Sequence, residues 1–250
     1  MKPDNMFERY QRQTLLPEVG IQGQETLKNS SVLLVGAGGL GSSAAFYLAA
    51  AGVGHIGLVD DDVVDQSNLN RQILHTPGTI GKSKVASARE TLKRFNPDVT
   101  ITPHPIKISS ENQLEELITD YDLVLDCTDN YPTRYTINQA CIHQQKPWIY
   151  GAVSEFEGQV MTLIPGTTPC YRCLYPSAPA ASEGIAAVMG VAPGLIGTLQ
   201  AAEALKYLLD TGKLLTGRLL FVDLMDIHFD IMTVTRNKEC PACGHSIFSG

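Results

Sequence analysis

The chain has 250 residues, of which 44% are hydrophobic and 18% charged, as in an ordinary globular protein. Acidic residues outnumber basic ones 26 to 19, and the net charge of −7 argues against non-specific nucleic-acid binding, which needs a basic surface. The polar N-terminus lacks a signal-peptide core, and no apolar run reaches the roughly 18 residues of a membrane span. We therefore expect a cytoplasmic protein that binds neither nucleic acid nor membrane. Its six cysteines then favour metal binding or catalysis over disulfides.

The first part of the chain alternates predicted strands with predicted helices. Residues 1–29 are expected to form a polar helical arm. Strands are then predicted at 31–35, 55–60, 99–103, in the apolar part of 121–130, and at 147–151. The predicted helices between them cover 39–52, 82–95, 113–119 and 132–143. Such alternation is typical of a parallel sheet with right-handed crossovers.

After residue 155 the pattern changes to strands at 158–165, 217–224 and 227–236 that no longer alternate regularly with helices, which favours an antiparallel extension of the same sheet. A core helix is predicted at 194–209, and the Pro-, Ala- and Ser-rich residues 175–187 resemble a mobile connector. We expect an α/β fold with a Rossmann-like, mostly parallel sheet and antiparallel strands added to it. No sharp boundary divides residues 1–250, so one domain is predicted, with the arm at 1–29, a Rossmann-like half at 30–155 and the extension at 156–250.

The stretch GAGGLG at residues 36–41 fits the glycine pattern G-x-G-x-x-G. In that pattern Gly36 permits a tight turn, Gly38 lets the backbone approach phosphate, and Gly41 lets helix and strand pack closely. The following helix N-terminus favours an anion. Asp60, at the end of the second predicted strand, is placed to bind ribose hydroxyls. These residues predict a nucleotide site but leave NAD and ATP open.

The loop DDDVVDQSNLNRQ at residues 60–72 combines four carboxylates with Arg71, and Lys84 lies in the next predicted helix. A triphosphate needs such cations, together with a carboxylate for Mg²⁺, whereas a nicotinamide has little use for them. Asp129 and Asn130 follow a later strand, so the topology places them at the same mouth as the glycine turn. The pattern favours Mg-ATP; a solvated acidic loop is the alternative.

Cysteines occur in two C-x-x-C pairs, at Cys170 and Cys173 and at Cys240 and Cys243. Two such pairs complete a tetrahedral Zn²⁺ site, and four protein ligands leave no position for a substrate. A structural zinc is therefore predicted, with a redox dithiol or unrelated thiols as alternatives. The remaining cysteines, at 127 and 141, lie in apolar segments and are interpreted as buried packing residues.

Together these motifs resemble the MoeB/ThiF/HesA family, the prokaryotic relatives of ubiquitin-activating enzymes, nearly from end to end. The matching stretches are RYQRQ, GAGGLG, DDDVVDQSNLNRQ, GKSKV, DCTDN, CYRCL, GTLQAAEALK and CPACG. The resemblance implies a homodimeric enzyme with a structural zinc that uses Mg-ATP. It would adenylate the C-terminal glycine of a ubiquitin-like sulfur carrier ending in Gly-Gly, such as MoaD or ThiS, and release pyrophosphate for molybdopterin- or thiamine-type sulfur transfer.

The resemblance also implies roles for matching positions. Arg71 and Lys84 would bind the phosphates, Asp129 would hold Mg²⁺, and Arg12 would reach the ATP of the other protomer. These four residues are the predicted catalytic set. The four paired cysteines would hold the zinc. The candidate nucleotide-binding residues are Gly36, Gly38, Gly39, Gly41, Asp60, Asp62, Ser67, Asn68, Asn70, Arg71, Gln72, Lys84, Asp129 and Asn130.

One departure from the family pattern concerns the connector after CYRCL. Several relatives carry a cysteine there, which in ThiS-activating members can link covalently to the carrier, whereas this connector has none, and Glu183 lies near the expected place. We expect activation to stop at the adenylate, with sulfur supplied by a separate donor; alternatively, the cysteine is dispensable. We also expect no fused sulfurtransferase domain, since the sequence ends at Gly250. Rival functions are an NAD(P)- or FAD-dependent oxidoreductase, adenylation of a non-carrier peptide, and a non-catalytic binding role.

Overall fold

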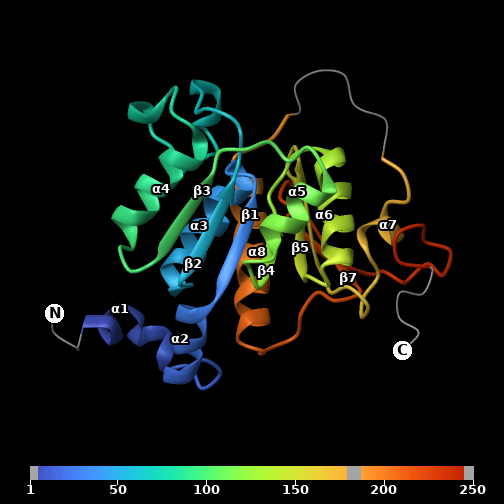
Figure 1. Ribbon diagram of the computed structural model, residues 1–250, viewed down its shortest axis with the longest axis horizontal. Helices are drawn as coiled ribbons and strands as arrows, with labels where there is room; N and C mark the ends of the chain where they lie inside the picture. The colour runs from blue at the N-terminus through green and yellow to red at the C-terminus, as the bar shows by residue number, and fades with distance from the viewer. Residues whose placement is uncertain (1–4, 179–186, 245–250) are drawn as a thin grey trace.

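A single mixed sheet forms the centre of the fold. The computed structural model describes residues 5–178 and 187–244, and the side chains from residue 8 onward. Within these residues the sheet has eight strands in the order β3-β2-β1-β4-β5-β6-β7-β8 (Figure 1). They are β1 Ser31–Val35, β2 His55–Val59, β3 Thr100–His104, β4 Leu123–Asp126, β5 Trp148–Ser154, β6 Glu157–Leu163, β7 Arg218–Asp223 and β8 His228–Thr233.

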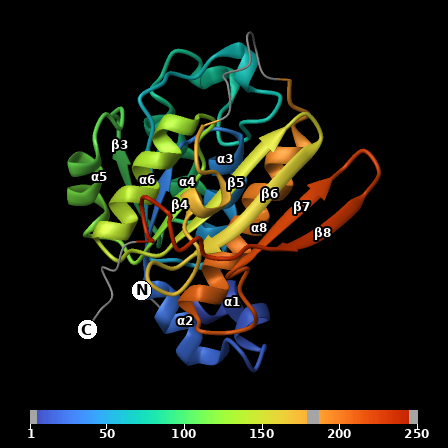
Figure 2. The same ribbon diagram turned by 90° about the vertical axis from the view of Figure 1, so that its right-hand side faces the viewer.

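The sheet is parallel from β3 to β5 and antiparallel from β5 to β8 (Figure 2). This confirms the predicted fold class. After β1 the chain builds β2 and β3 on one side and then crosses to place β4 on the other side. The strand order therefore reverses between β1 and β4. In open α/β sheets ligands bind at such a switch point, outside the carboxyl ends of the strands.

Helices cover both faces of the sheet, because successive residues of each buried strand point to opposite sides. Val32 and Leu34 of β1 pack in one core cluster with α3, α4 and α8, whereas Leu33 and Val35 pack in a second cluster with α5 and α6. The helices are α1 Asn5–Thr14, α2 Gly20–Asn29, α3 Gly39–Ala51, α4 Lys84–Phe95, α5 Glu111–Ile118, α6 Tyr131–His143, α7 Tyr171–Leu174 and α8 Val191–Leu208.

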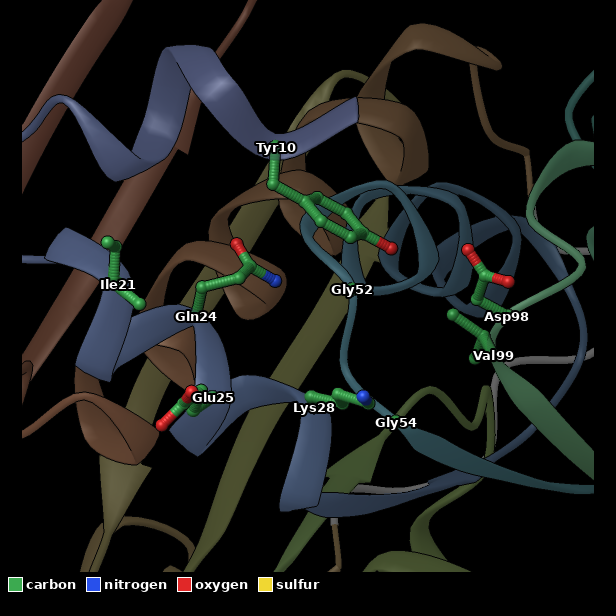
Figure 3. Close-up of a pocket in the computed structure, with 9 residues that line it drawn as sticks. All are labelled: Tyr10, Ile21, Gln24, Glu25, Lys28, Gly52, Gly54, Asp98 and Val99. Carbon is green, nitrogen blue, oxygen red and sulfur yellow. The ribbon is translucent and has the colours of Figure 1, made fainter. Parts of the chain in front are cut away.

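The N-terminal arm consists of α1 and α2 and lies at the amino ends of the parallel strands (Figure 1). Buried polar contacts fix it there: Asn96 Nδ2 donates to Tyr10 Oη at 2.8 Å and to the Ala49 carbonyl at 2.7 Å, and Gln24 Nε2 donates to the Ala51 carbonyl at 3.1 Å. Tyr10 and Gln24 also line a pocket of about 40 Å³ between arm and body (Figure 3). That volume is far below what a nucleotide needs.

Several predicted element bounds shift for identifiable reasons. The helix predicted from residue 82 begins at Lys84, because Ser83 instead forms a bridge with Val63. The helix predicted from residue 194 begins at Val191, since Pro193 is tolerated in a first turn. Short α7 was not predicted. Residues 179–186 of the predicted connector lie outside the described residues. No helix in the described part of the chain is long and apolar enough to cross a membrane.

Candidate active site

A cavity of about 700 Å³ opens at the carboxyl ends of β1, β2 and β4, at the switch point of the sheet. Its size is in the range of small-molecule sites. Ten of the candidate nucleotide-binding residues line it: Gly36, Gly38, Gly39, Asp60, Asp62, Arg71, Gln72, Lys84, Asp129 and Asn130. Segments separated by more than 90 residues in the sequence thus meet at one mouth, as the strand order predicts.

The glycine turn forms one wall of the cavity under tight steric limits. Gly36 has φ +108°, and a Cβ there would lie 2.4 Å from the Cys127 carbonyl oxygen. A Cβ on Gly41 would lie 2.1 Å from the Gly36 carbonyl oxygen, where the helix crosses the turn. Only glycine fits these positions without moving the backbone. Helix α3 begins at Gly39, so its first N–H groups have no intrahelical partner and face an anion site.

The Asp60 carboxylate fixes the shape of the turn and its neighbouring loop. Its Oδ2 accepts a hydrogen bond from the Ala37 N–H at 2.8 Å, and its Oδ1 accepts one from the Asp62 N–H at 2.9 Å. Lys84 Nζ lies 2.7 Å from Asp62 Oδ2 and 3.9 Å from Asp60 Oδ1. Lys84 is 7% exposed, so the cavity holds a buried ammonium balanced by carboxylates at its lip.

The loop after β2 is organised by its own side chains. Asp65 caps a short 3₁₀ helix, accepting from Ser67 N at 2.8 Å and from Ser67 Oγ at 2.6 Å, which holds the pKa of Asp65 below its usual value. Asn68 Oδ1 accepts from the Asp65 N–H at 3.2 Å. Arg71 Nη1 donates to the Ser67 carbonyl and to Asn70 Oδ1, both at 3.0 Å. These contacts hold the Arg71 guanidinium at the cavity wall.

Gln72 carries the clearest sign that the cavity is built for a ligand. The residue is 5% exposed and lines the cavity, and its Oε1 has no hydrogen-bond partner among the described residues. Buried side-chain oxygens are nearly always paired, so an orphan in a cavity wall indicates a group that binds there. Its Nε2 lies 3.7 Å from where a Cβ on Gly38 would stand, beside the glycine turn.

The segment after β4 brings Asp129 and Asn130 to the opposite wall, where both are exposed. Asn130 Oδ1 caps α6 by accepting from the Thr133 N–H at 3.0 Å. Below them, Arg134 Nη2 donates to the Thr128 carbonyl at 2.9 Å and its Nε lies 3.6 Å from the Asp126 carboxylate. Burial raises the pKa of Asp126, while Arg134 opposes that shift. The buried pair supports the loop that presents Asp129.

The donor set of the cavity fits a magnesium nucleotide. Mg²⁺ takes one or two carboxylates and completes its shell with phosphate oxygens and water. Asp129 offers an exposed carboxylate facing the cavity, while Arg71 and Lys84 supply positive charge for phosphates. Asp129 is the residue that would hold the ion.

Some candidate residues are not part of this wall. As far as the structure describes the chain, Ser67, Asn68 and Asn70 shape the loop behind Arg71 without lining the cavity, and Gly41 lies behind the turn. Arg12 is exposed on α1, which lies at the amino ends of the strands (Figure 1), whereas the cavity of the same chain lies at their carboxyl ends and is not lined by Arg12.

Other lining residues were missed from the sequence. They come from the β3–α5 loop, from α6, from the starts of α3 and α8, from the residues before α8, and from the ends of the central strands and the residues next to them: Val35, Leu40, Val59, Asp61, Ile106, Lys107, Ile108, Ser109, Cys127, Thr128, Pro132, Thr133, Thr136, Val153, Ala187, Val188 and Pro193. The rule that located Asp129 also applies to β3, a parallel strand beside β2, and it could have located the β3–α5 loop.

The four paired cysteines form a separate cluster beside Ile142 of α6. Cys170 Sγ lies 4.0 Å from Cys173 Sγ and 3.5 Å from Cys240 Sγ, and Cys173 Sγ lies 3.5 Å from Cys243 Sγ. With Zn–S bonds of about 2.3 Å, a tetrahedral site has sulfur separations of about 3.8 Å, whereas a disulfide has about 2.05 Å. The four thiols fit zinc. Cys127 and Cys141 are buried and lie outside this cluster, as expected.

Among proteins of known structure, the chain is similar in fold to E. coli MccB with MccA-N7isoASN. It superimposes with a TM-score of 0.86 at 22% identity, over 97% of this chain and 76% of MccB. A second solved structure, PaaA, gives a TM-score of 0.81 at 24% identity over 94% of this chain and 76% of PaaA. At these identities the likeness establishes the shared fold.

Sequence comparisons are more specific. The ThiF family model matches residues 10–242. The sulfur carrier protein adenylyltransferase of Thermus thermophilus is 47% identical, over 95% of this chain and 91% of the relative. The SAMP-activating enzyme E1 of Haloferax volcanii is 45% identical, over 95% of this chain and 89% of the relative. The adenylyltransferase and sulfurtransferase MOCS3 of Culex quinquefasciatus is 43% identical over 96% of this chain, which spans 56% of that relative. These matches confirm the expected resemblance: the chain is an adenylyltransferase-type enzyme that belongs to the ThiF family.

Proposed function

We propose that the chain uses Mg-ATP to adenylate the C-terminal glycine of a ubiquitin-like sulfur-carrier protein, MoaD- or ThiS-like and ending in Gly-Gly, and releases pyrophosphate. The observation that carries this proposal is the composition of the cavity. It combines a helix N-terminus, the cations Arg71 and Lys84, and the exposed carboxylate of Asp129. These groups suit a triphosphate and its metal better than a nicotinamide. Relatives named for sulfur carriers and activating enzymes support the choice of substrate.

The reaction needs charge neutralisation more than a protein nucleophile. A carboxylate oxygen of the carrier attacks the α-phosphorus, an acyl–phosphate bond forms, and the bond from that phosphorus to the bridging oxygen breaks, so that pyrophosphate leaves with the electron pair. No proton has to move. Because both reactants are anions, Arg71, Lys84 and the N–H groups of the glycine turn serve by holding them close and by stabilising charge that develops in the transition state. Mg²⁺, held by Asp129, would neutralise further phosphate charge.

Arg12 supports a homodimeric enzyme. The contacts of Tyr10 and Gln24 fix the arm at the amino ends of the strands, whereas the cavity lies at their carboxyl ends. In one chain the guanidinium therefore has no route to the phosphates. We propose that Arg12 acts on the nucleotide of the other protomer, so that each site is complete only in the dimer.

Sulfur transfer is proposed to use a separate donor, with activation on this chain ending at the adenylate. The support is the absence of cysteine from residues 175–187; Glu183 itself lies outside the described residues. A carboxylate cannot exchange thioesters or persulfides as a thiolate does. A thiol-sensitive covalent conjugate between carrier and chain, seen on a non-reducing gel, would contradict this step. The proposal covers molybdopterin- or thiamine-type sulfur transfer in the cytoplasm.

ATP–pyrophosphate exchange tests the proposal. Labelled pyrophosphate should enter ATP when the enzyme, Mg²⁺ and a carrier ending in Gly-Gly are present. A carrier lacking its terminal glycine is the matched control and should give background exchange. Exchange with a short peptide but with no carrier would reassign the substrate to a non-carrier peptide. Tight NAD binding without any exchange would favour the oxidoreductase alternative.

A further inference from the structure

His75 is a buried histidine behind the glycine turn, and the proposed chemistry does not use it directly. It follows the loop that presents Arg71 and Gln72 and is 5% exposed. Its Nε2 lies 3.1 Å from the Ala37 carbonyl oxygen, and its Nδ1 lies 3.0 Å from Ser87 Oγ on α4. The imidazole therefore links the glycine turn to the helix that carries Lys84.

The contacts fix the protonation of the ring. A carbonyl oxygen only accepts hydrogen bonds, so the nitrogen that faces it, Nε2, carries the hydrogen. Burial is the main cause that lowers the pKa of His75, and the nearby Lys84 ammonium lowers it further, against the opposing effects of the Ala37 carbonyl and the Asp60 carboxylate. The ring is thus neutral, Nδ1 has no hydrogen, and the Ser87 hydroxyl donates to it.

The peptide between Ala37 and Gly38 is held from behind. All peptide bonds in the described chain are trans, so the Ala37 carbonyl and the Gly38 N–H point in opposite directions. The carbonyl points into the protein toward His75, while Gly38 lines the cavity. The Gly38 N–H therefore faces the cavity, beside the first free N–H groups of α3. The Asp60 carboxylate accepts from the Ala37 N–H at 2.8 Å and fixes the preceding peptide in the same turn.

The consequence of losing this contact follows from the chemistry of glycine. Because Gly38 has no Cβ, the Ala37–Gly38 peptide can rotate more easily than a peptide between two residues that carry side chains. A rotated peptide would aim a carbonyl oxygen, rather than an N–H, at the cavity. A carbonyl repels a phosphate where the N–H would bind it.

We propose that His75 is a positioning residue of the nucleotide site, which keeps the Gly38 N–H directed at the triphosphate. This inference rests on the proposed use of ATP. It assigns His75 a specific effect on phosphate binding, distinct from a general contribution to stability. A merely structural histidine would support nucleoside and nucleotide binding alike.

The test compares His75→Leu with His75→Gln on the full-length enzyme. Leucine is apolar and removes the donor, whereas glutamine offers an amide N–H at a reach similar to that of Nε2. Dissociation constants for Mg-ATP and for adenosine are measured by calorimetry, without any carrier. We expect His75→Leu to weaken Mg-ATP binding by about tenfold, the effect of one lost hydrogen bond to a charged group. Adenosine binding should be unchanged, and His75→Gln should restore most of the Mg-ATP affinity.

Equal Mg-ATP affinity in wild type and His75→Leu, or a parallel loss of adenosine affinity that glutamine does not rescue, would overturn the inference. If the leucine variant does not fold, His75→Phe decides in its place, because it keeps a planar ring but has no N–H to donate to the Ala37 carbonyl. A selective loss of Mg-ATP affinity then supports the inference, and unchanged affinity overturns it. Failure of the wild type to bind Mg-ATP would instead refute the proposed function, so the two failures are distinguishable.

Discussion

Replacing Lys84 by glutamine should separate catalysis from stability. The ammonium is buried at the cavity wall, and its closest partner, Asp62 Oδ2 at 2.7 Å, belongs to a side chain that is 67% exposed. An ion pair with so exposed a partner contributes about 0–1 kcal/mol to folding. The second partner, the nearly buried Asp60 carboxylate at 3.9 Å, keeps its hydrogen bonds from the Ala37 and Asp62 N–H groups in the variant. For a chain of this length a loss of about 0–1 kcal/mol corresponds to a fall in Tm of no more than about 4 °C.

The effect on catalysis should be much larger. Removing one preorganised donor that stabilises transition-state charge lowers the rate by about 10²–10³. The interaction of the ammonium with a full charge about 4 Å away, at an effective dielectric constant of about 20, is about 4 kcal/mol and sets the upper bound on the loss. We therefore expect ATP–pyrophosphate exchange to fall by about 10²–10³ in Lys84→Gln.

Lys82 provides a matched control two residues earlier. Its Nζ lies 3.2 Å from Glu90 Oε2, the two side chains are 49% and 54% exposed, and it does not line the cavity. Lys82→Gln should leave exchange within about twofold of wild type, as expected for a surface change. Equal exchange rates for the two variants, or a loss in Lys84→Gln that follows unfolding in a thermal scan, would refute the assignment of Lys84 to the phosphate site.

Three further predictions concern the dimer, the cysteine cluster and the buried histidine. Arg12→Ala and Asp129→Ala should each abolish exchange. When the two variants are mixed equally and allowed to exchange subunits, half of the dimers have one intact site out of two, so the mixture should regain about one quarter of wild-type exchange. No recovery would place Arg12 in its own chain's site. Metal analysis should find about one zinc per chain in wild type and in Asp129→Ala, and less in Cys243→Ser; zinc loss in Asp129→Ala would show that the two sites are coupled. The pKa of His75 is lowered in the folded chain, so below about pH 6.5 the unfolded chain takes up a proton that the folded chain does not. The contribution of the neutral His75 to the free energy of unfolding is therefore complete above about pH 6.5 and declines as the pH falls. Between pH 7.5 and pH 5.5, the free energy of unfolding in urea should decline less in His75→Gln than in wild type. The decline that remains in the variant includes the contribution of His104, whose pKa is also lowered by burial. An equal decline in both proteins would contradict a neutral His75.

The fold was largely predictable because its strands carry strong local signals. Runs such as residues 32–35 are apolar throughout, as expected of strands covered on both faces, and glycine ends the helix after β1. The predicted strands at 217–224 and 227–236 follow one another without a helix, which was enough to predict their antiparallel pairing. Helices α7 and α8 lie between β6 and β7, so the pairing of those two strands had no such signal. Short α7 has no such signal, since four residues carry no periodicity.

The site was predictable only where the strand order decides position. Asp60 and Asp129 follow parallel strands, so the topology alone brings them to one mouth. Likewise, the spacing within each cysteine pair predicted a cluster that the fold assembles from distant segments. By contrast, the orphaned Gln72 oxygen and the contact of His75 with the Ala37 carbonyl depend on how the loop packs against α3 and α4. No residue pattern in a single sequence encodes those contacts.

The most direct test is the mass of the carrier after reaction. The enzyme is incubated with Mg-ATP, inorganic pyrophosphatase and a carrier ending in Gly-Gly, and the carrier is analysed by intact-mass spectrometry under mildly acidic conditions. We predict a gain in mass equal to AMP less one water on the carrier with a free C-terminal carboxylate, and no gain on the same carrier with an amidated C-terminus. An unmodified carrier, or AMP on both forms, would contradict adenylation of the terminal carboxylate.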